Sequence, residues 1–194
     1  MTSEIAVKTT GLPPVTDGGH DETALIDRAR AGDRDAQEAL VRRHLGEVFD
    51  LAWRIIGDRD VAQDAAQEAI ISALGALHRF RGDASFRTWL LRITVNAAKT
   101  QFRRQSRRRE VKLNLAADVR TEELDPAAET MLRAEAGRVA GLLGQLPPKQ
   151  RMAVVLRVNR GLSYAEVGEI LDCSEGAARV NYHLGVKRLR ELVQ

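Results

Sequence analysis

Cysteine and aromatic residues are scarce in this sequence. Its 194 residues include one cysteine, Cys173, and only 4% of them are aromatic. A lone cysteine has no partner for an internal disulfide, and the cysteine and histidines show no zinc-site spacing. Ala, Leu, Arg and Glu are abundant instead, which favours helices packed through aliphatic side chains. We therefore expect an all-α protein that holds no metal and no other cofactor.

Long hydrophobic runs are also missing. No apolar stretch approaches the roughly 18 residues that a membrane-spanning helix needs. The N-terminus lacks the charged-then-apolar layout of a signal peptide, and residues 1–20 show no apolar periodicity, which is typical of a flexible tail. A single cysteine suits a reducing compartment. These observations predict a soluble cytoplasmic protein that does not insert into a membrane.

Enzyme signatures are absent as well. The sequence contains no glycine-rich phosphate loop and no pairing of a nucleophile with a base, so an enzyme is not expected. The formal net charge is only +3. The total charge therefore says little about what this protein binds. The positions at which Arg and Lys cluster along the chain are more informative about its binding partner.

Apolar residues recur at helical spacing in two groups of segments. In the first group, helices are expected over residues 21–32, 35–56 and 58–77, and from about residue 85 into a basic run at 103–112. In the second, they are expected over residues 127–143, 148–157, 163–171 and 175–193. A polar, acidic stretch between them is typical of an interdomain linker. We predict two small helical domains, with a tail at 1–20, domains at 21–110 and 131–194, and a linker at 111–130.

The clearest local pattern lies near the C-terminus. Ser163 can cap a helix, and Glu166, three residues later, completes a capping box. After a turn of about three residues, Ser174 can cap a longer helix, which gives the layout of a helix-turn-helix. The second helix carries side chains suited to base edges and phosphates, namely Arg179, Asn181, His183, Lys187, Arg188 and Arg190. A helical hairpin whose charges merely face water fits the same spacing.

A stripe of acidic and amide residues follows one side of the helix predicted over residues 58–77. Its members recur at steps of three and four residues, opposite an apolar side, and are Asp60, Asp64, Gln67 and Glu68. Such a stripe can dock a basic partner helix, although a solvated face has the same pattern.

Rings, an amide and cations gather on the next helix and the loop before it. They are Phe80, Phe86, Trp89, Asn96, Lys99 and Arg103, a mixture that stacks on single-stranded bases and follows their backbone. Core packing is the alternative, above all for Trp89, because Leu90 and Ile93 follow it at helical spacing. The basic run at 103–112 fits phosphates better than a membrane surface, because Gln101 is a poor membrane-facing residue.

Taken in their order along the chain, these segments resemble the extracytoplasmic-function sigma factors, which keep only regions 2 and 4 of the larger sigma factors. Residues 60–69 look like the family's polymerase-binding helix, which docks on the clamp helices of the largest subunit. The resemblance implies that Asp60, Asp64, Gln67 and Glu68 bind core polymerase. Residues 80–90 and 92–96 are similar to the loop and helix that open and read the −10 element. The implied −10 residues are Phe80, Arg81, Gly82, Asp83, Phe86, Trp89, Asn96, Lys99, Arg103 and Arg104.

Residues 146–151 and 161–167 look like the start of region 4, whose helix-turn-helix reads the −35 element. The implied −35 residues are Ser163, Tyr164, Glu175, Gly176, Arg179, Asn181, His183 and Lys187. The sequence departs from the family's usual pattern at two other positions of the second helix, Val180 and Leu184. Many members carry a serine where Val180 stands and a second basic residue where Leu184 stands. Thr100 and Gln101 also stand near where relatives often have Asp or Asn.

The resemblance implies a transcription initiation factor that binds core bacterial RNA polymerase and directs it to promoters. The expected partners are core polymerase, promoter DNA in duplex form at −35 and single-stranded form at −10, and an anti-sigma factor. Two other classes remain open at this point. One is a stand-alone helix-turn-helix regulator that binds DNA without polymerase, and the other is a helical adaptor that binds only proteins.

Overall fold

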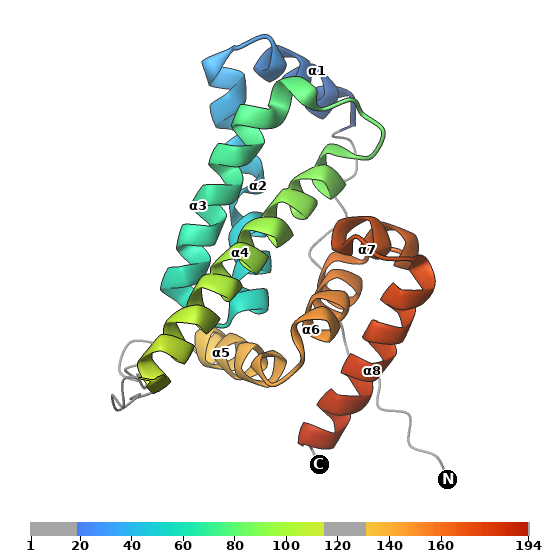
Figure 1. The fold of residues 1–194 in the computed structure, drawn as a ribbon. Coiled ribbons are helices and arrows are strands. Elements are labelled where there is room, and N and C mark those ends of the chain that lie inside the picture. The colour runs from blue at the N-terminus through green and yellow to red at the C-terminus, as the bar shows by residue number, and fades with distance from the viewer. Residues whose placement is uncertain (1–18, 115–130, 194) are drawn as a thin grey trace. The chain divides into compact units, whose positions relative to one another are not determined.

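Helices account for the regular structure of the described chain. The structure, a computed structural model, describes residues 19–114 and 131–193, with side chains for 22–104 and 137–193, and shows no strand within these ranges (Figure 1). The elements are α1 (Gly19–Arg30), α2 (Arg34–Ile56), α3 (Arg59–Ala76), the short helix η1 (Leu77–Arg79), α4 (Phe86–Asn114), α5 (Met131–Gly144), α6 (Pro148–Val154), the π-helical turn η3 (Val155–Asn159), α7 (Tyr164–Leu171) and α8 (Glu175–Val193). The all-α prediction is confirmed. Residues 1–18 of the predicted tail and 115–130 of the predicted linker lie outside the described residues.

Contacts between Cα atoms divide the chain into residues 1–40 and residues 41–194. In the first unit, α1 and the start of α2 are joined by a tight turn at Asp33. The backbone N–H groups of Asp35 and Ala36 donate to Asp33 Oδ1 at 3.0 and 3.1 Å, so Asp33 caps α2. The Ala36 N–H and the guanidinium of Arg28 lower the pKa of the Asp33 carboxyl. Ile26 is buried on α1 in this unit.

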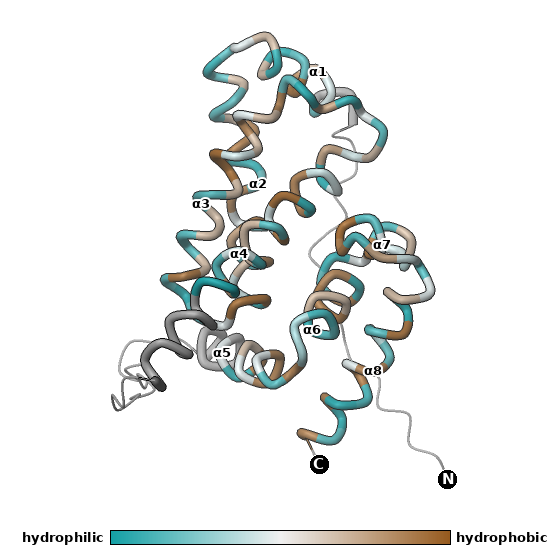
Figure 2. The backbone as a smooth tube through the Cα atoms, in the orientation of Figure 1, coloured by the Kyte–Doolittle hydropathy of each residue, from teal (hydrophilic) through white to brown (hydrophobic). Residues whose placement is uncertain are grey.

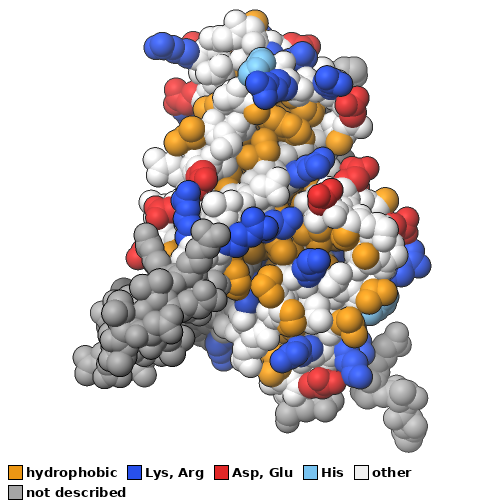
Figure 3. Space-filling model, viewed as in Figure 1, with side chains coloured by type: hydrophobic (Ala, Val, Ile, Leu, Met, Phe, Trp, Pro, Cys, Tyr) orange, Lys and Arg blue, Asp and Glu red, His pale blue; other side chains and the backbone are white. Residues whose placement is uncertain are grey.

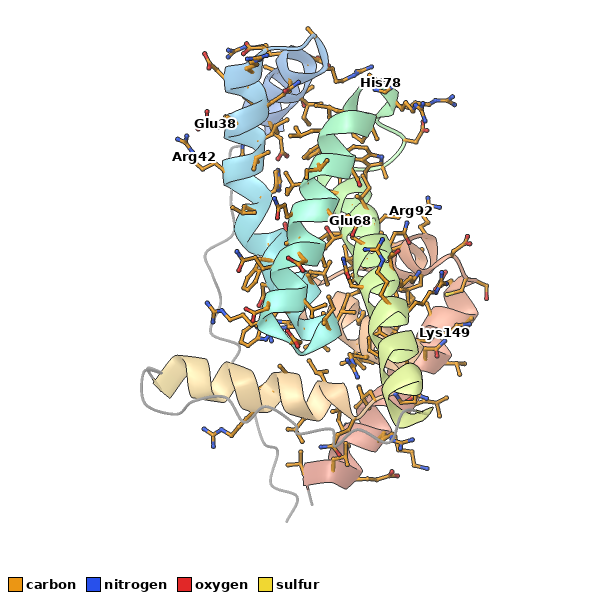
Figure 4. The ribbon with its side chains drawn as sticks, turned by 60° about the vertical axis from the view of Figure 1, so that its left-hand side comes forward. Glu38, Arg42, Glu68, His78, Arg92 and Lys149 are labelled. Atoms are coloured by element: carbon orange, nitrogen blue, oxygen red, sulfur yellow. The ribbon has the colours of Figure 1, made fainter. Side chains whose placement is uncertain are left out.

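The second unit begins with the rest of α2 and continues through the close pair α3 and α4, which lie side by side in both ribbon views (Figures 1 and 4). Asp58 caps α3, because its carboxylate accepts the Val61 N–H at 3.0 Å. The buried side of α3 consists of small residues, Ala62, Ala65, Ala66, Ala69 and Ala73. Side chains this small let α4 approach closely with its own Leu91, Val95 and Ala98, which are all buried.

In the C-terminal half, α8 packs against α6 and α7. Hydrophobic and hydrophilic positions both recur along α8 (Figure 2), and its buried residues, Ala178 and Gly185, are two turns apart on one side, as in an amphipathic helix. Gly185 is the point of closest approach, since a Cβ placed there would lie 2.7 Å from Val154 Cγ2 and 3.2 Å from the Gln150 carbonyl oxygen. Only a hydrogen atom fits, so α8 lies directly on α6.

One cluster of buried apolar residues connects helices from the beginning to the end of the second unit. It includes Leu51 of α2, Leu91 and Val95 of α4, Leu156 of η3 and Val167 of α7. This continuity is the physical reason why residues 41–194 form one unit. The division predicted from the linker is a different one, and it stays a prediction, because residues 115–130 lie outside the described part of the chain.

Most predicted helix limits match the structure within a few residues. Two differences concern helix ends. The helix α4 continues to Asn114, beyond the domain limit expected at 110, and the helix expected over residues 148–157 is α6 followed by the π-helical turn η3. No helix in the described ranges is both long and apolar enough to cross a bilayer.

Candidate nucleic-acid interface

The helix-turn-helix predicted from the helices at residues 163–171 and 175–193 is formed by α7, a short turn and α8. The Glu166 N–H donates to Ser163 Oγ at 3.2 Å, and the Ser163 N–H donates to Glu166 Oε2 at 2.7 Å, which confirms the capping box. Asp172 ends α7 in the left-handed conformation with a φ of 59°. The Ala177 N–H then donates to Ser174 Oγ at 3.2 Å, so Ser174 caps α8 as predicted.

The turn closes tightly on Gly168. The backbone N–H groups of Asp172 and Cys173 both donate to the Gly168 carbonyl oxygen, the second at 2.9 Å. A Cβ at residue 168 would lie 2.7 Å from the Cys173 carbonyl oxygen. The angle between α7 and α8 therefore depends on a glycine that the sequence reading did not single out.

Replacing Gly168 by alanine is expected to lower the free energy of unfolding by about 1–3 kcal/mol, because the Cys173 backbone must move to make room. Urea unfolding followed by circular dichroism measures the change. Gly46 is a matched control, since it lies within α2 and a Cβ there would meet nothing within 4 Å. Gly46→Ala should stabilise by up to about 1 kcal/mol. Equal stability changes at the two glycines would contradict the close contact.

The capping box also predicts a pH dependence. Hydrogen bonds from the Ser163 N–H and hydroxyl lower the pKa of Glu166 from its ordinary value of 4.5. A lowered carboxyl pKa in the folded state contributes stability that is present above 4.5 and is lost as the pH falls through the folded value. Glutamine keeps an acceptor for the Ser163 N–H but loses the charge in the first turn of α7. Glu166→Gln should therefore destabilise the protein by roughly 0.3–1 kcal/mol at pH 7 and by much less in strong acid. Urea midpoints of both proteins across the acid range test this, and a pH-independent difference would contradict it.

The exposed side of α8 mixes basic and apolar side chains, which Figure 3 shows over this helix. Arg179 is exposed but held, because its guanidinium pairs with Glu175 at 2.9 Å and lies 5.0 Å from the centre of the Tyr164 ring. The His183 ring lies 6.2 Å from the same tyrosine. Gly176 and Lys187 are exposed, while Asn181 is half-buried with its amide donating to a helix carbonyl.

The loop between η1 and α4 stands on an aromatic cluster. Phe80 and Phe86 are buried and meet edge to face, with ring centres 5.6 Å apart. The half-buried Trp89 contacts both rings at 5.3 and 5.5 Å. Above them Arg81, Gly82 and Asp83 are exposed. Phe80 and Phe86 therefore pack in the core. Their buried rings support the loop and have no exposed face on which a base could stack.

Farther along α4, three predicted residues share one side of the helix. Asn96 and Arg103 are exposed, and Lys99 is half-buried, so that desolvation lowers its pKa. Arg104 is exposed and lies 3.8 Å from Glu68. Arg103 and Arg104 are the members of the predicted basic run whose side chains are described; the others lie outside that range.

The acidic stripe lies on the outer side of α3. Asp60, Asp64 and Gln67 are exposed. Glu68 is half-buried and accepts the Gln101 amide at 3.1 Å, so it also links α3 to α4; Figure 4 shows it on α3. Ile71 lies on the same side with 64% of its surface exposed, and the sequence reading missed it. Its position four residues after Gln67 was the available signal.

An open hollow lies where α4 meets the helix-turn-helix. Arg92, which Figure 4 labels on α4, lines it together with Glu169, Asp172 and Glu175. Carboxylates outnumber the cation, so this hollow is unsuited to a phosphate backbone. DNA is therefore expected on the basic faces of α4 and α8. No group of histidine, cysteine and acidic residues in the described ranges is arranged to hold a metal ion.

Comparisons with known proteins agree with this arrangement. The family model for sigma-70 region 2 matches residues 40–108, and the model for sigma-70 region 4 matches residues 136–189. The ECF RNA polymerase sigma-E factor of Haemophilus influenzae is 33% identical over 181 residues, which cover 89% of this chain and 93% of that protein. The RNA polymerase sigma-H factor of Pseudomonas aeruginosa is 37% identical over 80% of this chain and 84% of that protein. The ECF RNA polymerase sigma-E factor of Escherichia coli K12 is also 37% identical, with coverage of 81% and 86%.

Two solved structures have a similar fold. CnrH in complex with the cytosolic domain of CnrY gives a TM-score of 0.66 at 26% identity, covering 89% of this chain and 96% of that one. The sigma factor RpoE in complex with the anti-sigma factor NepR from Bartonella quintana gives 0.64 at 20% identity, covering 80% and 95%. Both sigma regions are thus present in order, and relatives match over nearly their full length. The chain belongs to the extracytoplasmic-function (ECF) RNA polymerase sigma factors of the sigma-70 family.

Proposed function

We propose that this chain binds core bacterial RNA polymerase and directs it to promoters by contacting −10 and −35 DNA at two separate surfaces. The observation that carries the proposal is the order of the two matched regions, each with an exposed polar or basic helix face. Region 2 supplies α3 and α4, and region 4 supplies α7 and α8. The chain itself makes and breaks no covalent bond, and it works in the cytoplasm beside polymerase.

Polymerase binding is assigned to the outer side of α3. Asp60, Asp64 and Gln67 offer exposed oxygen acceptors to a basic partner, and Glu68 adds a fourth from its position beside Gln101. Ile71 adds an exposed apolar contact on the same side. A desolvated apolar centre with a charged rim is the usual anatomy of a tight interface.

The −10 contact is assigned to the loop at 81–85 and the side of α4 that carries Asn96, Lys99 and Arg103. An amide can hydrogen bond the edge of an unstacked base, and cations follow a single-stranded backbone. Trp89 is the ring of the aromatic cluster that stays half-exposed beside this path. Stacking is therefore assigned to Trp89, while Phe80 and Phe86 hold the loop from below.

The −35 contact is assigned to the first turns of α8, because a recognition helix contacts base edges with its N-terminal residues. Arg179 can leave Glu175 for a guanine, and Lys187 is placed for a phosphate. Ser163 and Tyr164 position α7 against the backbone, and Asn181 and His183 complete the face. Affinity for duplex should fall with salt, with a log–log slope of roughly −0.9 per phosphate contact.

Control by an anti-sigma factor is part of the proposal. The RpoE structure of similar fold is described as a complex with an anti-sigma factor. Exposed polymerase- and DNA-binding faces are surfaces that an inhibitor can cover. A stand-alone helix-turn-helix regulator is the second candidate, and it would protect DNA from cleavage without polymerase.

Transcription from a genomic promoter library, with purified core polymerase and the full chain, tests the proposal. We expect transcripts that start downstream of a shared pair of elements, and no specific start sites with core polymerase alone. An active core that gives no promoter-specific transcript with this chain would count against the sigma role. Protection of DNA by the chain alone would favour the stand-alone regulator.

A further inference from the structure

Two aliphatic side chains occupy the centre of the exposed side of α8. Val180 is 57% exposed and Leu184, one turn later, is 48% exposed. They lie opposite Ala178 and Gly185, which are buried against the rest of the domain. Their exposure thus follows from the orientation of the helix, which its buried side fixes.

We propose that Val180 and Leu184 recognise thymine methyl groups in the −35 element, an inference that rests on the proposed function. In the major groove, the C5-methyl of thymine is the apolar group by which base pairs differ, and aliphatic side chains recognise it by contact. Neither residue has a hydrogen-bonding group in its side chain. In duplex DNA, an aliphatic side chain can therefore distinguish one base pair from another by van der Waals contact with this methyl group.

The neighbouring side chains favour DNA over an apolar protein as the partner. Lys187 lies on the same side of α8, two turns after Val180, and Arg188 beside it is also exposed. Cations along the edge of a narrow aliphatic strip fit a groove between phosphate strands. Arg179 and His183 lie beside the strip and turn toward Tyr164. The strip itself is left to face the floor of the groove.

The assignment predicts a specific loss. Replacing a contacted thymine by uracil removes one methyl group and changes no hydrogen-bonding group. Burial of one methyl group corresponds to about a three- to fivefold change in affinity. We expect that loss at one or two positions of the −35 element, and no loss at thymines elsewhere in the duplex.

The experiment begins with holoenzyme assembled from core polymerase and the full chain, which selects −35 duplexes from a randomised library. Each thymine of the selected element is then replaced by uracil, and binding is measured with the wild type and with Val180→Ala and Leu184→Ala. The uracil effect should disappear for one thymine in each variant. Val158→Ala is the matched control, because Val158 is a similarly exposed valine at 60% and belongs to η3, outside the recognition helix α8. It should keep every uracil effect.

The possible results distinguish a failure of the methyl contact from a failure of the proposed sigma role. A selected element that binds equally well with uracil throughout overturns the methyl contact and leaves the sigma role standing. A uracil effect that persists in both alanine variants overturns the assignment to Val180 and Leu184. A failure of holoenzyme to enrich any duplex, with core polymerase that is active with another sigma factor, overturns the proposed function and this inference together.

Discussion

Replacing Arg151 by methionine is expected to lower the free energy of unfolding by about 3 kcal/mol. Arg151 is 4% exposed, and its guanidinium donates to the carbonyl oxygens of Ile55 at 2.6 Å, Leu146 at 3.3 Å and Gly144. Ile55 and Gly144 stand at the C-terminal ends of α2 and α5, so one side chain satisfies carbonyls that two helices leave free.

The size of the effect follows from two opposing contributions. Each buried carbonyl left without a donor costs about 1–3 kcal/mol. Burial of the guanidinium is itself unfavourable, because its charged form loses contact with water. The same desolvation lowers the pKa of Arg151, and its Nε has no hydrogen-bond partner in the described structure. Methionine fills a similar volume and removes that second cost, so the net loss is smaller than three separate penalties.

Thermal unfolding measures the result. A loss of about 3 kcal/mol corresponds to a fall in Tm of roughly 6–12 °C for a protein of this size. Lys149→Met is the matched control, since Lys149 is exposed on the first turn of the same helix, and it should change stability by less than about 0.5 kcal/mol. A Tm for Arg151→Met within about 1 °C of the wild type would refute the capping role.

Reversing the charge at Asp64 is expected to weaken binding to core polymerase by about a hundredfold. Truncation of a hot-spot residue of an interface costs about 2 kcal/mol or more, and about 1.4 kcal/mol corresponds to a tenfold change in Kd. Asp64 is exposed at the middle of the acidic stripe. Asp64→Arg should therefore remove an attraction and add a repulsion toward a basic partner while leaving the fold unchanged.

Competition with a labelled sigma factor for core polymerase measures this Kd. Glu191→Arg is the matched control, because it reverses an exposed acidic residue on another helix, in the last turn of α8, where a cation suits the helix dipole. Circular dichroism should show both variants fully helical. If Asp64→Arg binds core polymerase within about threefold of the wild type, the stripe on α3 is not the docking surface.

Local sequence patterns were enough to predict the helices, most of their caps and most of their exposed sides. Ser163 and Glu166 are three residues apart, and the bonds between them depend on neighbours along the chain. The same holds for Ser174 at the start of α8. At the start of α3 the sequence allowed either Asp58 or Asp60 as the cap, and the bond from the Val61 N–H identifies Asp58. Periodicity also predicted which side of α3 carries Asp64 and Gln67, because a helix fixes the direction of a side chain from its position alone.

Which residues these helices contact depends on the folded chain. Phe86 is compatible in sequence with both base stacking and core packing, and its burial against Phe80 comes from how the loop folds onto α4. The bond from Arg151 to the Ile55 carbonyl joins residues 96 positions apart, and no local pattern reports such a partner. Gly168 is required by the distance to the Cys173 carbonyl, which is set by the angle between two helices. Helix formation is governed by interactions over three or four residues, whereas burial and close approach depend on segments that only folding brings together.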